Sequence, residues 1–267
     1  MDNRPILFLD SGIGGIPYCR DFLKRNGYET VYYLADRENF PYGPRKKEEI
    51  ALILISLTEK LLNKVDPKLA VIACNTASIS ALSTLRQKFP KLPFVGTVPA
   101  IKPAVNACKS GKTGVLGTER TIQDIRALNL ETGNCEIIGV AAPELVEFVE
   151  KSIDSADEKE KTEIVKKHIN IFREQGIDAL VLGCTHFLYL LDEFRREAEP
   201  AIKIFDSLEG ITNRIEFLLN ENDCVLRAQK NCTHERKFIL TGTQPPDSSW
   251  INRAKAYGYD LCLINEL

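Results

Sequence analysis

Two short stretches decide the fold: Val71-Ile72-Ala73-Cys74-Asn75-Thr76 and Val181-Leu182-Gly183-Cys184-Thr185-His186. Each is an apolar run that ends in cysteine and is followed by small polar residues and a helical pattern. Such a run is typical of a buried parallel strand, which places the cysteine at the carboxyl end of the strand. Ligands of open α/β sheets bind at that end. The two thiols therefore suit a reaction that uses two similar proton carriers.

The rest of the chain alternates apolar strand-like runs with helical patterns, which predicts the α/β class, with mostly parallel sheets flanked by helices. The expected strands are Ile6–Leu9, Val31–Ala35, Leu69–Ala73, Phe94–Val98, Gly114–Leu116, Glu136–Val140, Ala179–Leu182, Ile202–Phe205 and Phe238–Leu240. The expected helices include Arg45–Asn63, Ala77–Phe89, Glu160–Gln175 and Leu208–Asn220.

A faint internal repeat accompanies this alternation. Leu9-Asp10-Ser11 resembles Leu116-Gly117-Thr118. The interval to the following cysteine is also similar, 63 residues from Ser11 to Cys74 and 66 from Thr118 to Cys184. Two α/β halves of similar plan would face each other across a cleft, which is a favoured ligand site. The alternative is a chance similarity between two strand–turn–helix units.

Composition narrows the class of protein. The 267 residues fit one large or two modest domains, and a net charge of −2 gives no electrostatic reason to expect nucleic acid or an anionic membrane as a partner. No apolar run is long enough for a membrane helix, and the N-terminus does not resemble a secretion signal. The eight cysteines form no C-x-x-C motif, and three histidines make a zinc site improbable. We therefore expect reduced thiols in the cytoplasm and no metal.

The glycine-rich turn Asp10–Gly15 follows the first strand and opens a helix, so its amides suit an anion. A dinucleotide fingerprint is the competing interpretation, with Asp36 as the ribose-binding acid. Pro17 stands where that fingerprint needs its third glycine, which disfavours a dinucleotide-dependent oxidoreductase. Asn39–Pro44 forms a second stiff loop, after the second strand, which is either a plain turn or a substrate-facing loop.

Polar neighbours distinguish the two cysteines from ordinary buried thiols. Asn75 and Thr76 follow Cys74 directly, and Thr185 and His186 follow Cys184. Hydrogen-bonding side chains and helix N-terminal amides favour the thiolate form of a cysteine. The two remaining histidines, His168 and His234, are assigned structural roles.

Four strings in register resemble the glutamate racemases of the aspartate/glutamate racemase superfamily: Phe8–Gly15, Phe40–Gly43, Ala73–Ser78 and Gly183–His186. The resemblance implies a cofactor-independent racemase with two pseudo-symmetric α/β domains and its active site between them. The first domain would combine residues 1–97 with 207–267, and the second would be 98–206. The catalytic bases would be Cys74 and Cys184, assisted by Asp10 and His186. The substrate-binding residues would be Asp10, Ser11, Tyr42, Gly43, Asn75, Thr76, Thr118, Thr121, Thr185 and His186.

The chain departs from the family pattern in two places, beside Asp36 and before the helix that supplies Glu150. Glu150 stands where the family has an acid that supports the histidine, and both residues are secondary assignments. Arg37 follows Asp36 where the family often has threonine, and Ala142 stands where it often has cysteine before Pro143. Aspartate racemases are an alternative family for this chain, but they resemble a different second motif, with a glutamic acid residue where this chain has His186. A two-lobed small-anion binding protein is the alternative outside enzymes. The resemblance implies that the substrate is glutamate and that the D-glutamate formed supplies peptidoglycan synthesis. It is also compatible with a homodimer.

Overall fold

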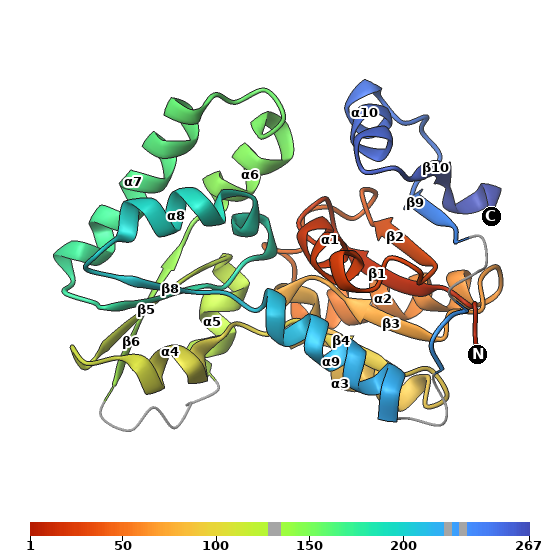
Figure 1. Cartoon of the computed structure of the whole chain (residues 1–267), viewed down its shortest axis with the longest axis horizontal. Coiled ribbons are helices and arrows are strands. Elements are labelled where there is room, and N and C mark those ends of the chain that lie inside the picture. Colours follow the sequence, from red (N-terminus) through yellow and green to blue (C-terminus); the bar gives the residue numbers. More distant parts are fainter. Residues whose placement is uncertain (128–134, 222–225, 230–233) are drawn as a thin grey trace. The chain divides into compact units, whose positions relative to one another are not determined.

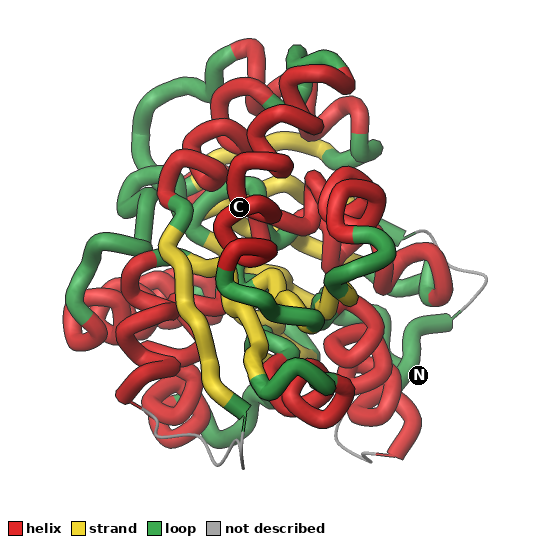
Figure 2. Tube along the Cα trace, turned by 90° about the vertical axis from the view of Figure 1, so that its left-hand side faces the viewer, coloured by secondary structure: helices red, strands yellow, loops and turns green. Residues whose placement is uncertain are grey.

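The computed structural model describes residues 1–127, 135–221, 226–229 and 234–267 (Figure 1). The chain divides into two compact units. Unit 1 contains Met1–Thr97 and Leu208–Leu267, and unit 2 contains Val98–Ser207. Each unit has its own sheet, with helices flanking the strands (Figures 1 and 2).

The sheet of unit 1 has six strands, and every strand pair in it is parallel. Its central strands are buried throughout, as expected for a parallel sheet covered on both faces. Their order is β10 (Asp260–Leu263), β9 (Arg236–Leu240), β2 (Val31–Ala35), β1 (Ile6–Asp10), β3 (Leu69–Ile72) and β4 (Phe94–Gly96).

Alternate residues of β1 face opposite layers of helices, because successive side chains of a strand point to opposite faces. Leu7 and Leu9 join the core cluster formed with helices α2 (Lys47–Leu62) and α3 (Asn75–Lys88). Phe8 instead contacts Phe22 of α1 (Ile16–Arg25), with ring centroids 6.0 Å apart. The remaining helices of the unit are α9 (Leu208–Glu221), which packs beside α1, α10 (Ser248–Ala256) and the 3₁₀ turn η2 (Ile264–Glu266).

Unit 2 has a smaller sheet of four parallel strands. Their order is β6 (Glu136–Ala141), β5 (Lys112–Gly117), β7 (Ala179–Leu182) and β8 (Lys203–Phe205). Its helical elements are α4 (Ile101–Ala107), α5 (Glu119–Ala127), α6 (Pro143–Ser152), α7 (Glu158–Glu174), η1 (Thr185–Leu190) and α8 (Leu191–Ala198). A capping box between Asp157 and Glu160 begins α7, which explains why the charge-rich stretch there is helical.

Four strands of each unit follow the same order. The series β2-β1-β3-β4 in unit 1 corresponds to β6-β5-β7-β8 in unit 2. The residue before each cysteine makes an equivalent backbone hydrogen bond in the two units: Ala73 N donates to Leu9 O at 2.7 Å, and Gly183 N donates to Leu116 O at 2.6 Å. Cys74 and Cys184 therefore occupy equivalent positions in their own sheets.

The α/β class predicted from the sequence is confirmed, and all nine expected strands are present; Val31–Ala35 and Ala179–Leu182 have the predicted ends, and the other seven differ by one or two residues at one or both ends. The tenth strand, β10, was not predicted, because its short sequence Asp260–Leu263 lies at the edge of the sheet and begins with a charged residue. The segment after Cys184 forms the 3₁₀ turn η1 before α-helical geometry starts at Leu191. No helix among the described residues is long and apolar enough to cross a membrane.

Candidate functional site

Asp10 ends β1 of unit 1, and its carboxylate organises the glycine-rich turn behind it. The side chain is fully buried, and its Oδ1 accepts hydrogen bonds from Ser11 Oγ and Gly12 N, each at 3.2 Å. Gly15 is required for close approach in the same turn, because a Cβ there would lie 2.7 Å from the Cβ of Ala73. The turn thus presses against the strand that leads to Cys74.

Cys74 follows β3 and begins α3. Its carbonyl accepts the first helical hydrogen bond, from Ser78 N at 2.8 Å, so the thiol lies at the helix N-terminus, where the helix dipole favours negative charge. Cys74 is 7% exposed, and the adjacent Asn75 and Thr76 are each 3% exposed. The Asn75 Oδ1 atom is buried and accepts no hydrogen bond from the residues that the structure describes. A buried acceptor without a donor is costly, which makes Asn75 a candidate to receive a ligand N–H.

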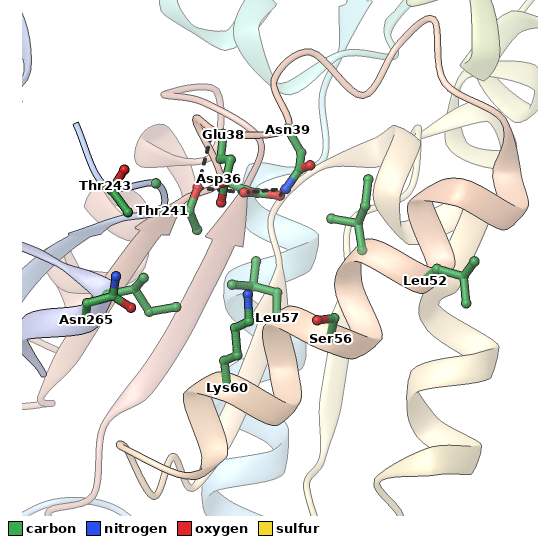
Figure 3. A pocket seen from close by; sticks show the side chains of 13 residues that line it. Asp36, Glu38, Asn39, Leu52, Ser56, Leu57, Lys60, Thr241, Thr243 and Asn265 are labelled. Carbon is green, nitrogen blue, oxygen red and sulfur yellow. Dashed lines mark hydrogen bonds between the residues drawn. The ribbon is translucent and has the colours of Figure 1, made fainter.

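Asp36 is the centre of a buried hydrogen-bond network at the carboxyl ends of β2 and β9. Its carboxylate accepts Tyr42 Oη at 2.6 Å. It also accepts Thr241 Oγ1 at 2.7 Å and Asn39 Nδ2 at 3.0 Å (Figure 3). Burial raises the pKa of Tyr42 well above its ordinary value, and the negative charges of Asp36, Cys74 and Asp10 raise it further. Tyr42 therefore remains a protonated donor, and its loop is fixed to the sheet.

This network argues against a dinucleotide-binding site at Asp36 and the glycine-rich turn. Asp36 has no exposed surface, and both of its oxygens are already occupied by protein donors. The Asp10 carboxylate also accepts the Gly12 amide that a pyrophosphate would need. An open pocket of about 560 Å³ adjoins the network, lined by Asp36, Asn39, Thr241 and residues of α2, but its lining includes neither Asp10 nor Cys74 (Figure 3).

Cys184 of unit 2 heads a chain of three polar side chains. Its Sγ lies 3.7 Å from His186 Nδ1, and His186 Nε2 lies 2.7 Å from Glu150 Oε1 on α6. Burial alone lowers the pKa of His186, but the hydrogen bonds and negative charges of Cys184 and Glu150 outweigh it and hold that pKa well above its ordinary value. The arrangement favours an imidazolium beside the sulfur.

Gly183 allows this geometry, because a Cβ there would lie only 2.9 Å from the carbonyl oxygen of Leu116. Thr185, directly after the cysteine, is 1% exposed. At the end of the neighbouring strand β5, the Thr118 hydroxyl donates to Thr121 Oγ1 at 3.0 Å and accepts the Thr121 amide at 3.2 Å. Unit 2 therefore gathers Cys184, Thr118 and Thr121 at the carboxyl edge of one sheet, as unit 1 gathers Cys74, Asp10 and Ser11.

Sequence reasoning missed Thr241, whose hydroxyl supports Asp36. The available signal was its position, since it follows β9 as Asp36 follows β2. His168 is 1% exposed, and its Nε2 lies 3.1 Å from Glu144 Oε1, which links α7 to α6. No cluster of three metal-ligating side chains occurs in the described ranges. Gly43 lies in the Tyr42 loop and is partly exposed.

Comparisons with known proteins agree on one family. The family model described as Asp/Glu/Hydantoin racemase matches residues 19–213. The glutamate racemase of Bartonella tribocorum is 35% identical over 264 residues, which cover 91% of this chain and 94% of that protein. The glutamate racemase of Sphingopyxis alaskensis is 38% identical over 223 residues, covering 81% of this chain and 82% of that protein.

Solved structures give the same result for the fold. A glutamate racemase isoform of Bacillus anthracis superposes with a TM-score of 0.81 at 29% identity, covering 98% of this chain and 97% of the other. The Escherichia coli glutamate racemase, solved with L-glutamate and the activator UDP-MurNAc-Ala, superposes with a TM-score of 0.84 at 26% identity and covers 98% of both chains.

Proposed function

The chain belongs to the Asp/Glu racemase family and functions as a glutamate racemase, an isomerase, and we propose that it inverts glutamate with Cys74 and Cys184 as two opposed bases. No pyridoxal phosphate or metal takes part in the proposed reaction. The observation that carries the proposal is the equivalent placement of the two thiols. Each follows a buried strand, begins a helical segment, and has its preceding amide bonded to the neighbouring central strand.

The chemistry requires two groups because inversion removes the α-proton from one face of the substrate and returns a proton to the other. In the proposed L-to-D direction, the Cys184 thiolate takes the α-proton of L-glutamate. The Cys74 thiol then donates its proton to the opposite face of the carbanion, which yields D-glutamate. The products are a Cys184 thiol and a Cys74 thiolate, ready for the reverse direction. Two identical side chains suit such reversibility, since each acts as base or acid in turn.

His186 and Glu150 support the proposed role of Cys184. An imidazolium 3.7 Å from the sulfur stabilises the thiolate, and Glu150 at 2.7 Å stabilises the imidazolium. In unit 1 the proposed assistant of Cys74 is Asp10. Its carboxylate is held by Ser11 and Gly12, so it is oriented before substrate arrives.

Donors for the substrate carboxylates are proposed to come from Thr76, Thr121, Thr185 and the amide of Gly43, and from Ser11 and Thr118 once their hydroxyls turn from Asp10 and Thr121. Tyr42, whose proton goes to Asp36, offers the substrate its oxygen as an acceptor. Hydrogen bonds to the α-carboxylate would stabilise the charge that develops beside it when the proton leaves. The orphaned Asn75 Oδ1 is an acceptor, so we assign it to the substrate ammonium group. Asp36 is assigned the supporting role of fixing the Tyr42 loop.

We further propose that the enzyme works in a reducing cytoplasm, because both bases must remain free thiols, and that its D-glutamate supplies peptidoglycan synthesis. The substrate assignment rests on the relatives, among them the Escherichia coli enzyme solved with L-glutamate. Aspartate is the competing substrate. Aspartate racemases resemble a motif with a glutamic acid residue at the position of His186, so the histidine in this chain favours glutamate as the substrate.

The test follows circular dichroism of L-glutamate and, separately, L-aspartate with purified, dialysed and chelator-treated protein. We expect racemisation of glutamate and far slower change of aspartate. Activity that returns only with pyridoxal phosphate or a metal would exclude the cofactor-free reaction. A protein that binds glutamate without changing its dichroism would instead support the small-anion binding alternative.

Single substitutions test the two-base mechanism. Cys74→Ser and Cys184→Ser should each reduce racemisation by about 10²–10⁴-fold, because serine is a far weaker base. With a glutamate analogue that carries a leaving group on its β-carbon, one deprotonation suffices for elimination. The Cys74 variant should then eliminate from the L form and the Cys184 variant from the D form. Loss of the same enantiomer's reaction in both variants would contradict the assignment.

A further inference from the structure

The turn that follows β9 is fastened to the end of β2 by the side chain of Thr241. The Thr241 amide donates to Ala35 O at 3.3 Å, and the residue is 3% exposed. Its hydroxyl accepts Glu38 N at 3.1 Å and lies 2.7 Å from Asp36 Oδ1 (Figure 3). Because an amide can only donate, the hydroxyl proton is directed to the Asp36 carboxylate. Thr241 thus gives that carboxylate a donor of fixed direction.

Arg37 holds the same turn through its backbone. Its Nε donates to Thr241 O at 2.9 Å. Its two terminal nitrogens donate further along the turn, Nη1 to Pro245 O at 3.4 Å and Nη2 to Gln244 O. The turn bends at Gly242, whose φ of +84° lies in the left-handed region that favours glycine. The loop after β2 and the turn after β9 are therefore joined by a guanidinium as well as by a hydroxyl.

Asp36 connects Thr241 to the loop that carries Tyr42. The second carboxylate oxygen, Oδ2, accepts Tyr42 Oη at 2.6 Å, and Asp36 has no exposed surface. Tyr42 belongs to the buried core cluster that contains Cys74. The next residue is Gly43, whose amide is one of the proposed donors to the substrate. A change at Thr241 is therefore transmitted through one carboxylate to a loop of the proposed site.

We propose that Thr241 is a positioning residue of the racemase, which orients Asp36 and through it the Tyr42 loop that binds glutamate. The inference rests on the proposed function, because the substrate-binding role of this loop belongs to that proposal. Thr241 lies outside residues 19–213, which the family model matches. Neither Thr241 nor Asp36 exchanges a proton with the substrate in the proposed reaction. Losing the hydroxyl should therefore weaken substrate binding and raise KM more than it lowers kcat.

The first test is Thr241→Val, which keeps the branched shape of the side chain and removes the donor to Asp36. We expect KM for L- and D-glutamate to rise about tenfold, the size expected when a hydrogen bond to a charged group is lost, with a much smaller change in kcat. Thr241→Ser retains the hydroxyl and should return KM close to that of the wild type. An unchanged KM in Thr241→Val, or equal impairment of the serine variant, would overturn the assignment.

Thr212→Val is the matched control, because it removes the same kind of hydrogen bond from unit 1. The Thr212 hydroxyl donates to Asp21 Oδ2 at 2.7 Å, and Thr212 is 1% exposed. Urea titrations should show that both valine variants reduce the free energy of unfolding. Only Thr241→Val should raise KM. An equal rise of KM in Thr212→Val would show that Thr241 acts through stability alone, and the assignment would be wrong.

Arg37→Gln tests the same turn without altering a buried side chain, so it remains informative if Thr241→Val folds poorly. KM should rise in this variant too, by a smaller factor, because the Thr241 hydroxyl is retained. An unchanged KM would contradict the role of the turn. Calorimetric titration with D-glutamate measures the affinity of each variant independently of turnover. A wild-type protein that binds glutamate without racemising it would refute the proposed function, whereas equal affinities of wild type and Thr241→Val would refute the positioning role.

Discussion

Replacing Glu150 by Gln keeps the size of the side chain and removes the charge that faces His186. The His186–Glu150 pair is buried, with side chains 5% and 11% exposed and an N–O distance of 2.7 Å. A hydrogen bond between charged groups contributes about 1.5–3 kcal/mol, and each tenfold change corresponds to about 1.4 kcal/mol. We therefore expect kcat/KM for L-glutamate to fall roughly ten- to hundredfold, because the imidazolium beside Cys184 is less stable.

The pH profile gives the sign of the effect. Glu150 helps to raise the pKa of His186, so its removal lowers that pKa, and the alkaline limb of the L-glutamate profile should move to lower pH. Initial rates by circular dichroism between mildly acidic and alkaline pH measure this shift. The matched control is Glu144→Gln, which alters the other histidine–carboxylate pair of unit 2, His168–Glu144 at 3.1 Å. An unchanged profile in the Glu150 variant, or an equal shift in the Glu144 variant, would refute the reasoning.

Two further predictions concern stability and local geometry. Glu29→Gln should reduce the free energy of unfolding by about 3–5 kcal/mol in urea titrations, because it leaves the fully buried Lys68 ammonium without its carboxylate partner at 2.7 Å; a loss below about 1 kcal/mol, typical of an exposed pair, would contradict this. Gly183→Ala should cost about 1–3 kcal/mol and most of the racemase activity, since its Cβ would meet the Leu116 carbonyl at 2.9 Å, whereas Gly210→Ala, with no atom within 4 Å, should be tolerated.

The sequence was most informative where burial and chemistry coincide along the chain. The apolar runs before Cys74 and Cys184 predicted buried parallel strands, and the structure places both cysteines after such strands. Short-range signals of this kind need no tertiary information. Strand ends were less accurate: Gly114–Leu116 extends to Lys112–Gly117, because hydrogen bonds to β6 and β7 continue past the apolar residues.

Contacts between distant elements were beyond the sequence. Thr241 reaches Asp36 only because β9 pairs with β2. Glu150 could be assigned to His186 only by family resemblance, since α6 must pack against η1 for the carboxylate to reach the ring. Each of these residues is a single polar residue outside any repeating pattern, so hydrophobic periodicity carries no information about its partner.

The two units share a strand order but differ in what accompanies the thiol. At the carboxyl edge of unit 1, Asp10 is the carboxylate beside the turn that packs against the Cys74 strand, and it is held by neighbours on its own loop. In unit 2 the corresponding strand ends in Gly117-Thr118, and the ionisable support for Cys184 comes from His186 with Glu150 on a separate helix. A carboxylate and an imidazolium bias a nearby thiol in opposite directions, since the first disfavours a thiolate and the second favours it. The shared topology thus supplies two equivalent positions with unlike ionisable neighbours, and under the proposed two-base mechanism these neighbours would distinguish the two thiols.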